Sequence, residues 1–146
     1  MLYPSNVPTG VIAAMRYLNV LAVGALCVSL IGCGSAKVAS VQPVLMEDIA
    51  QNHVRRAILQ AFDTRSWYVQ SDDSGEFTAI KVSNDKKAQV LVSYTDTMVE
   101  ISYLDSENMG YTVYPNYDKI HPAYNCWVKT LRDDIERELE YIVTVE

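Results

Sequence analysis

Apolar residues along this chain follow two different periods, and the change of period separates its predicted elements. Between Met46 and Phe62 they recur at helical spacing and form one face, made of Ala50, Val54, Ala57, Ile58 and Ala61. Glu47 and Asp48 stand at the start of this segment, and we expect them in the first turn, where carboxylates interact favourably with the helix dipole. The pattern predicts an amphipathic first helix.

Four runs with alternating apolar and polar residues follow, at 66–71, 77–83, 88–94 and 98–104, with short polar turns between them. The second run alternates Thr78, Ile80 and Val82 against Phe77, Ala79 and Lys81. The shared faces of the last two runs are Ala88, Val90, Val92 and Tyr94, and Val99, Ile101 and Tyr103. A period of two with short turns predicts an antiparallel meander.

Residues 105–121 follow neither period and are rich in tyrosine, so we expect an irregular aromatic loop there. Pro122 then opens a second helix, since the missing N–H has no cost in a first turn. The helix carries one apolar stripe, made of Tyr124, Val128, Leu131, Ile135, Leu139 and Ile142. Two amphipathic helices can cover one face of the sheet, which predicts an α+β two-layer sandwich with the order α-β-β-β-β-α.

The beginning of the chain has the features of an export signal. Arg16 precedes the uncharged segment 17–31, which is shorter than the roughly 20 residues of a comfortable membrane span. The segment ends in Leu30-Ile31-Gly32-Cys33, which resembles the bacterial lipoprotein signal, and the resemblance implies cleavage before Cys33 and acylation of its thiol. An uncleaved membrane helix, or a leader in which Cys33 is incidental, is the alternative. Met15 is a more natural start than Met1.

This interpretation divides the chain into three parts: a signal peptide at 1–32, a lipidated tether at 33–44 and one α+β domain at 45–146. Two or three acyl chains on Cys33 hold a protein stably at a membrane. Gly34 follows the cysteine where an aspartate is the inner-membrane retention signal. For a Gram-negative source, the resemblance therefore implies a location on the periplasmic face of the outer membrane.

Charge and cysteine content narrow the possible functions. Without residues 1–32, the chain has 11 Lys and Arg against 18 Asp and Glu, a formal net charge of −7. The absence of a basic stripe argues against nucleic-acid binding, which requires neutralised phosphates. Cys126 is the only cysteine after Cys33, so it is expected to be a reduced thiol beside Trp127 or to form an intermolecular bridge. No metal or cofactor motif is present, and none is predicted.

Two segments resemble motifs of a family of small, uncharacterised bacterial envelope lipoproteins. The family pattern Ser-Glu-Asn-Leu-x-Tyr matches residues 106–111, with Met109 in place of Leu. The pattern Ile-His-x-x-Tyr-Asn-x-Trp-Val-x-x-Leu matches residues 120–131. A glycine that precedes the first-strand tryptophan in the family is Ser66 here. The resemblance covers about 80 residues and implies an envelope location and this fold, without an activity or a ligand.

The same motifs contain the candidate binding surface, made of Tyr111, Tyr114, Tyr117, His121, Tyr124, Asn125 and Trp127. In one interpretation these residues present aromatic rings to a peptide or glycan. In the other they form a locked corner, in which His121 caps the helix or bonds Asn125, Asn108 and Asn125 hold the loop, and the tyrosines pack.

No set of catalytic residues stands out. Ser106, Asp118 and His121 can be drawn as a triad, but nothing in their spacing supports one, and the pair His121 and Cys126 is equally unsupported. We therefore expect a non-enzymatic envelope module that binds a protein partner, of undetermined oligomeric state. The alternatives are an inhibitor or immunity protein against a cationic wall-degrading enzyme, suggested by the acidic charge, and an envelope hydrolase.

Overall fold

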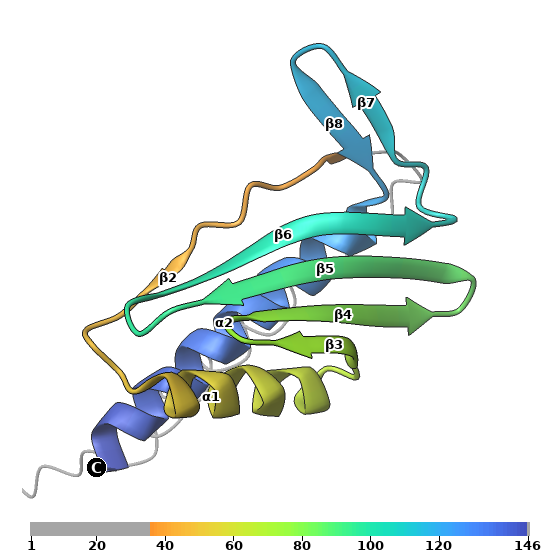
Figure 1. Cartoon of the computed structure of the whole chain (residues 1–146). Coiled ribbons are helices and arrows are strands. Elements are labelled where there is room, and N and C mark those ends of the chain that lie inside the picture. Colours follow the sequence, from red (N-terminus) through yellow and green to blue (C-terminus); the bar gives the residue numbers. More distant parts are fainter. Residues whose placement is uncertain (1–35, 146) are drawn as a thin grey trace, which may run out of the picture. The chain divides into compact units, whose positions relative to one another are not determined.

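A five-stranded antiparallel sheet forms the centre of the fold in the computed structural model, which describes residues 36–145 (Figure 1). Its strands, in the order β2-β6-β5-β4-β3, are β2 (Val44–Leu45), β6 (Met98–Glu107), β5 (Lys86–Tyr94), β4 (Glu76–Ser83) and β3 (Tyr68–Asp73). Strands β3 to β6 are the predicted meander, and the predicted α+β class is confirmed. The predicted leader and Cys33 lie outside the described residues.

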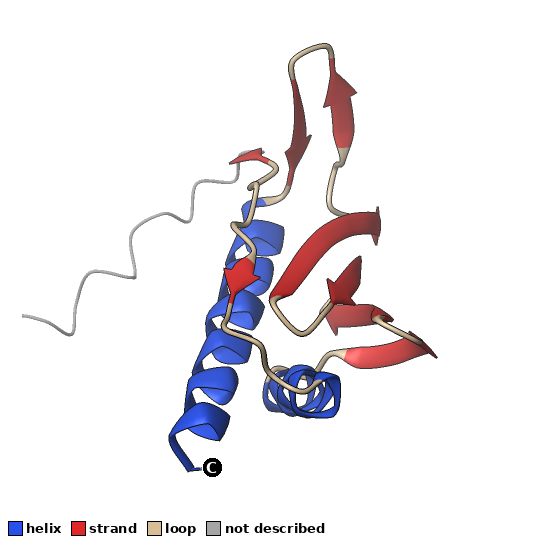
Figure 2. Cartoon of the chain, turned by 60° about the vertical axis from the view of Figure 1, so that its left-hand side comes forward, coloured by secondary structure: helices blue, strands red, loops and turns tan. Residues whose placement is uncertain are grey.

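Two helices, α1 (Gln51–Thr64) and α2 (Pro122–Val145), cover one face of this sheet, and no helix of the described residues covers the other face (Figures 1 and 2). From α1, Phe62 meets Phe77 edge to face, with ring centroids 5.7 Å apart. From α2, Tyr124 meets Tyr103 in the same way at 5.6 Å. Every residue of the predicted α2 stripe is buried.

The inward positions of the sheet follow the predicted alternation. Ala88, Val90 and Val92 of β5 have no exposed surface, and Tyr94 is 7% exposed. Full burial of a valine or leucine side chain contributes about 1.5–3 kcal/mol. The core therefore lies between the inner face of the sheet and the two helices.

The first helix begins five residues later than predicted, because residues 44–49 are bound to the sheet. Val44 pairs with Val99, and the N–H groups of Met46 and Ile49 donate to the carbonyls of Thr97 and Asp96. A backbone engaged in this way cannot continue a helix. The prediction that Glu47 and Asp48 occupy the first turn is therefore wrong, and that turn contains no acidic residue.

The turn that ends α1 contains Ser66. This residue has a φ of 55°, in the left-handed region that favours glycine. The N–H of Trp67 donates to the carbonyl of Phe62 and closes the helix end. The turn therefore forms with serine, in a conformation that glycine adopts at lower cost.

The predicted irregular loop at 105–121 is also wrong, since most of it is regular. Strand β6 continues to Glu107, and β7 (Thr112–Tyr114) and β8 (Tyr117–Ile120) form a hairpin that projects from the body (Figure 1). Pro115 and Asn116, both common in turns, connect the two strands. Tyrosine-rich segments have a high β-propensity, which the absence of strict alternation concealed.

The segment expected to be a tether belongs to the domain from Ala36 onward. Strand β1 (Ala36–Lys37) pairs with β8, which makes a three-stranded sheet in the order β1-β8-β7. The N–H of Val38 donates to the carbonyl of Asp118 at 2.8 Å. We call residues 36–45 the N-terminal strap. Within the described part, neither helix has the length and apolar character needed to cross a membrane.

Candidate functional site

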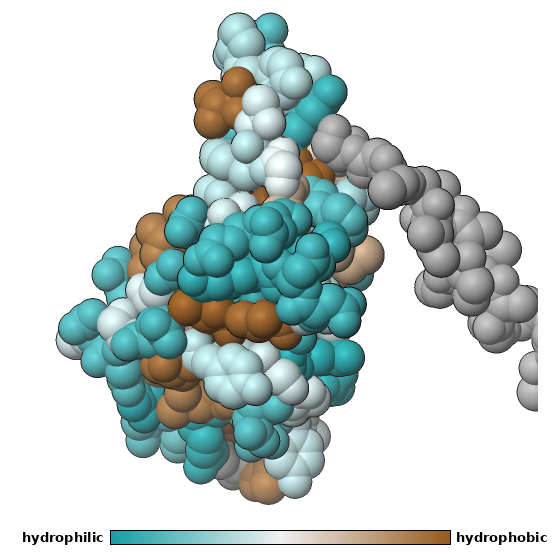
Figure 3. Space-filling view, turned by 90° about the vertical axis from the view of Figure 1, so that its right-hand side faces the viewer, coloured by the Kyte–Doolittle hydropathy of each residue, from teal (hydrophilic) through white to brown (hydrophobic). Residues whose placement is uncertain are grey.

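The seven predicted binding residues fall into five places. Tyr114 and Tyr117 lie on the β7–β8 hairpin, with ring centroids stacked 5.1 Å apart and about 40% of each residue exposed. Lys119 lies over both rings, with its Nζ 5.0 Å from the centroid of Tyr114. Val113, which precedes Tyr114 on β7, is 69% exposed. Figure 3 shows a small hydrophobic patch on this hairpin, with further hydrophobic bands among hydrophilic residues on the body below it.

Tyr111 and Tyr124 join an aromatic cluster at the base of the hairpin. Tyr103 stacks on Tyr111 with centroids 4.3 Å apart and meets Tyr124 edge to face. The Tyr111 hydroxyl donates to Oδ2 of Asp118 at 2.8 Å, and this bond raises the pKa of Tyr111. Burial raises the pKa of Tyr124 far above neutrality. These phenols stay protonated and act as packing groups that position the hairpin.

His121 directly precedes the first residue of α2. Its Nδ1 accepts a hydrogen bond from the backbone N–H of Ala123 at 3.1 Å. The backbone N–H of His121 donates to the carbonyl of Met109. The imidazole therefore satisfies one of the free N–H groups of the helix start. Capping was one of the two roles expected for His121, and a bond to Asn125 was the other.

Asn125 instead binds the N-terminal strap. Its Oδ1 accepts from the N–H of Ala39 and its Nδ2 donates to the carbonyl of Lys37, both at 2.8 Å. Asn108, with a φ of 55°, donates from Nδ2 to the carbonyl of Asp85 in the β4–β5 turn. Both asparagines satisfy backbone groups, as in the locked-corner interpretation, although Asn125 holds the strap rather than the loop.

Trp127 lies apart from the other six, in a cavity that sequence reasoning did not find. Lys81 of β4 places its Nζ 5.7 Å from the ring centroid of Trp127 and 5.9 Å from that of Trp67. The alternation of β4 indicated the inward position of this lysine, because Lys81 falls on the same face of the strand as the buried Phe77 and Ala79. A lysine at an inward position requires a polar or aromatic environment.

A buried carboxylate beside this cavity was also missed. Asp134 is 1% exposed and accepts hydrogen bonds from Nε and Nη2 of Arg65, and it forms an ion pair with Nη2 of Arg137 at 2.7 Å. The hydrogen bond from Arg65, aided by Arg137, lowers the pKa of Asp134. Asp134 therefore stays ionised and links the end of α1 to α2. Its position between Leu131 and Ile135 of the apolar stripe was the available signal.

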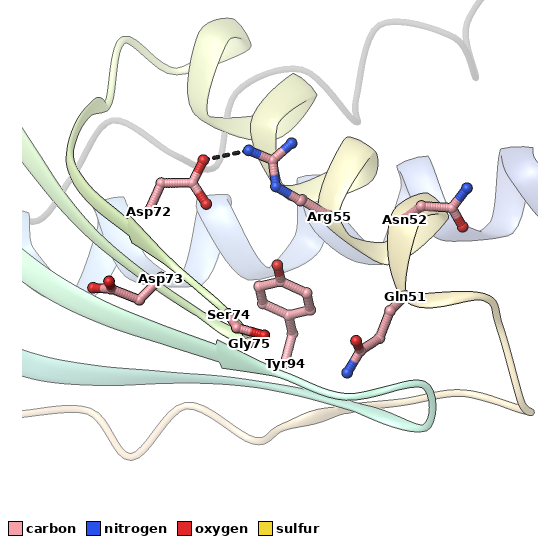
Figure 4. Close-up of a pocket in the computed structure, with 8 residues that line it drawn as sticks. All are labelled: Gln51, Asn52, Arg55, Asp72, Asp73, Ser74, Gly75 and Tyr94. Carbon is pink, nitrogen blue, oxygen red and sulfur yellow. Dashed lines mark hydrogen bonds and ion pairs between the residues drawn. The ribbon is translucent and has the colours of Figure 1, made fainter.

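A second cavity, of about 320 Å³, lies between the start of α1 and the β3–β4 turn (Figure 4). Arg55 reaches from α1 to Asp72 of β3 and lies over the ring of Phe77, 5.5 Å from its centroid. Tyr94 points into the same space, and Gly75 closes the turn with a φ of 83°. Because Arg55 already has a carboxylate partner and an aromatic contact, this cavity presents no unpaired cation.

Ser106, Asp118 and His121 each have a hydrogen-bond partner outside any catalytic arrangement, whereas the thiol of Cys126 has none among the described residues. The hydroxyls of Ser106 and Tyr103 are 3.0 Å apart, and Asp118 accepts from Tyr111. The Nδ1 of His121 is engaged at the helix start, and the thiol of Cys126 is exposed and unpaired. Among residues 36–145, no group of His, Cys, Asp and Glu is arranged to hold a metal ion.

Comparison with protein families, with curated proteins and with solved structures found no match to this chain.

Proposed function

We propose that this chain is a lipid-anchored protein of the bacterial cell envelope, whose domain binds a protein partner through the β7–β8 hairpin. The membrane part of the proposal rests on the sequence Leu30-Ile31-Gly32-Cys33. The binding part rests on one observation, the exposed apolar and aromatic side chains of the hairpin, Val113, Tyr114 and Tyr117. These side chains contribute little to the core of their own domain.

The hairpin is ordered before any partner binds. Strand β8 pairs with β7 on one side and with β1 on the other, and Lys119 lies over the stacked pair of Tyr114 and Tyr117. A preordered contact loses less conformational entropy on binding than a flexible one. Tyrosine is also enriched in protein interfaces, where its ring is apolar and its hydroxyl can form hydrogen bonds.

Strand β7 adds a further means of recognition. It is an edge strand, and all three of its residues are exposed. An edge strand presents unpaired N–H and C=O groups, to which an extended segment of another protein can pair. The proposed partner therefore adds a strand beside β7 and contacts the apolar side chains of the hairpin.

The proposed anchor would place this surface close to the membrane. Because the strap joins the domain at Ala36, three peptide units separate it from Cys33, and these extend over about 10 Å at most. The partner is therefore expected to be an envelope protein exposed near the bilayer surface.

Site-specific photocrosslinking in intact cells tests this proposal. A photoreactive residue at Val113 should give a recurrent crosslinked product, whereas one at Val143, which is 63% exposed on α2, should not. The substitution Tyr117→Ala should reduce the product at least about fivefold, and Tyr141→Ala, at another exposed tyrosine, should leave it unchanged, because interface energy is concentrated in a few residues.

Equal products from both positions, or no product from Val113, would contradict the hairpin as the contact. The variant Cys33→Ser separates the two parts of the proposal. It should release the protein from the membrane fraction while the folded domain keeps its hairpin.

A further inference from the structure

The cavity around Lys81 joins elements that are distant in sequence. It has a volume of about 250 Å³ and is lined by Arg65, Trp67, Lys81, Cys126, Trp127 and Thr130. Arg65 and Trp67 lie in the turn after α1, Lys81 belongs to β4, and the other three residues belong to α2. Both tryptophans of the whole chain line this one cavity.

Lys81 carries a positive charge that no carboxylate balances within the described residues. Its ammonium group lies near both indole rings and donates to the main-chain carbonyl of Arg65. Burial lowers the pKa of Lys81, and the positive charge of Arg65 lowers it further. Such an environment disfavours the charged form unless an anion is nearby.

Trp67 supplies a second unsatisfied group. Its residue is 4% exposed, and its Nε1 is the one buried side-chain polar atom without a hydrogen-bond partner in the part of the chain described. Buried donors nearly always have an acceptor, because an unmade hydrogen bond destabilises the fold. The lining residues provide no carboxylate that could serve Lys81 or Trp67.

Arg65 completes a set of donors around the cavity. It uses Nε and Nη2 for Asp134, which leaves Nη1 without a partner among the described residues. The lining thus combines an ammonium and a guanidinium with two indole ring systems. Donors of this kind bind oxyanions, and aromatic walls contact a carbon skeleton.

We propose that this cavity binds the carboxylate of a small organic acid, with Lys81 and Arg65 facing the carboxylate and the two indoles contacting the rest of the molecule. An inorganic anion could use the charges but not the aromatic walls. The site lies apart from the β7–β8 hairpin in its residues, so it goes beyond the proposed partner contact.

Intrinsic fluorescence of the full chain reports on this site directly, because both indoles line it. The probes are N-acetylglycine for a peptide carboxyl terminus and glucuronate for an acidic sugar, with N-acetylglycinamide and glucose as uncharged counterparts. Inorganic phosphate is a further control, and ionic strength is held constant with sodium chloride. A saturable emission change is expected for at least one acid and for neither uncharged counterpart.

The exposed thiol of Cys126 provides a second measurement, since this residue lines the same cavity as well as a neighbouring one beside the strap. Its alkylation by iodoacetamide, followed by mass spectrometry of the peptide, should slow as the acid saturates the site. A response to one acid identifies its source as peptide or sugar. A response to both shows that the carboxylate is the recognised group.

Variants separate binding from a purely structural role of Lys81 between the rings. Lys81→Met should weaken acid binding at least about tenfold, because a hydrogen bond to a charged group contributes that much. Lys81→Arg keeps the charge and should retain binding, which covers the case in which Lys81→Met does not fold. Lys87→Met, at a lysine paired with Glu107 outside the cavity, is the matched control and should bind as the parent does.

Three results with the parent chain would overturn the proposal. They are the absence of a saturable change with both acids, equal binding of acids and uncharged counterparts, and phosphate binding as tight as that of the acids. Unchanged affinity in folded Lys81→Met would overturn it as well.

Discussion

Strands β5 and β7 use similar residues in opposite ways. Val90 and Val92 of β5 have no exposed surface, whereas Val113 of β7 is 69% exposed. Strand β5 lies in the middle of the five-stranded sheet, and β7 is the edge of the three-stranded one. The comparison shows that the body of the domain is stabilised by apolar burial, while the hairpin is held by pairing and by contacts at its base.

The comparison predicts a large difference between substitutions of the same kind. Leu131→Ala removes a fully buried side chain of α2 and should lower the free energy of unfolding by about 2–5 kcal/mol. Val113→Ala should change it by no more than about 0.5 kcal/mol, because the hairpin side chain is exposed. Urea denaturation of both variants measures the difference. Equal losses would mean that the hairpin belongs to the cooperative core.

The ion pairs of Asp134 with Arg65 and Arg137 are expected to stabilise the body of the domain. Asp134→Asn should lower the free energy of unfolding at pH 7 by about 1–3 kcal/mol, since a buried charged hydrogen bond is lost. This loss of stability is smaller than that expected for a fully buried ion pair, because the side chains of Arg65 and Arg137 are partly exposed. Asp133→Asn, at the adjacent exposed carboxylate, should cost less than about 1 kcal/mol.

The same substitution has a defined pH dependence. Because the pKa of Asp134 is lower in the folded state, its contribution is complete above the unfolded pKa of about 3.9 and is lost as the pH falls through the folded value. The stability difference between the parent and Asp134→Asn should therefore shrink below about pH 4. A difference that is constant between pH 7 and pH 3 would contradict this assignment.

The smallest expected loss, apart from Val113→Ala and the control positions, lies at the junction between body and hairpin. Asn125→Ala removes both side-chain bonds to the strap, and each such bond contributes roughly 0.5–1.5 kcal/mol. Because both bonds are exposed to solvent, the loss of stability should lie in the lower part of the combined range, at about 1–2 kcal/mol. Amide hydrogen exchange at Ala39 and along β8 should accelerate more than exchange along β5. Asn52→Ala, at a residue whose side-chain oxygen accepts from the adjacent N–H of His53, is the control. Unchanged exchange at Ala39 would show that the strap is held by other contacts.

The sequence alone determined the elements whose signal is local and periodic. The stripe from Tyr124 to Ile142 and the inward positions of β5 are buried as the spacing indicates, because burial of one face requires a repeat of 3.6 or 2 residues. The position of His121 before Pro122 likewise identified the helix start that it caps.

Only the tertiary structure decided what depends on residues far apart in the chain. Asn125 binds Lys37 and Ala39, 88 and 86 positions away, and no local pattern encodes such a contact. The start of α1 was displaced in the same way, because pairing of Val44 with Val99 engages the backbone that helical propensity alone would have used. Lys81 illustrates both cases. The alternation of β4 placed it on the inward face of the strand, but its contacts with Trp67 and Trp127 arise only when β4 meets α2.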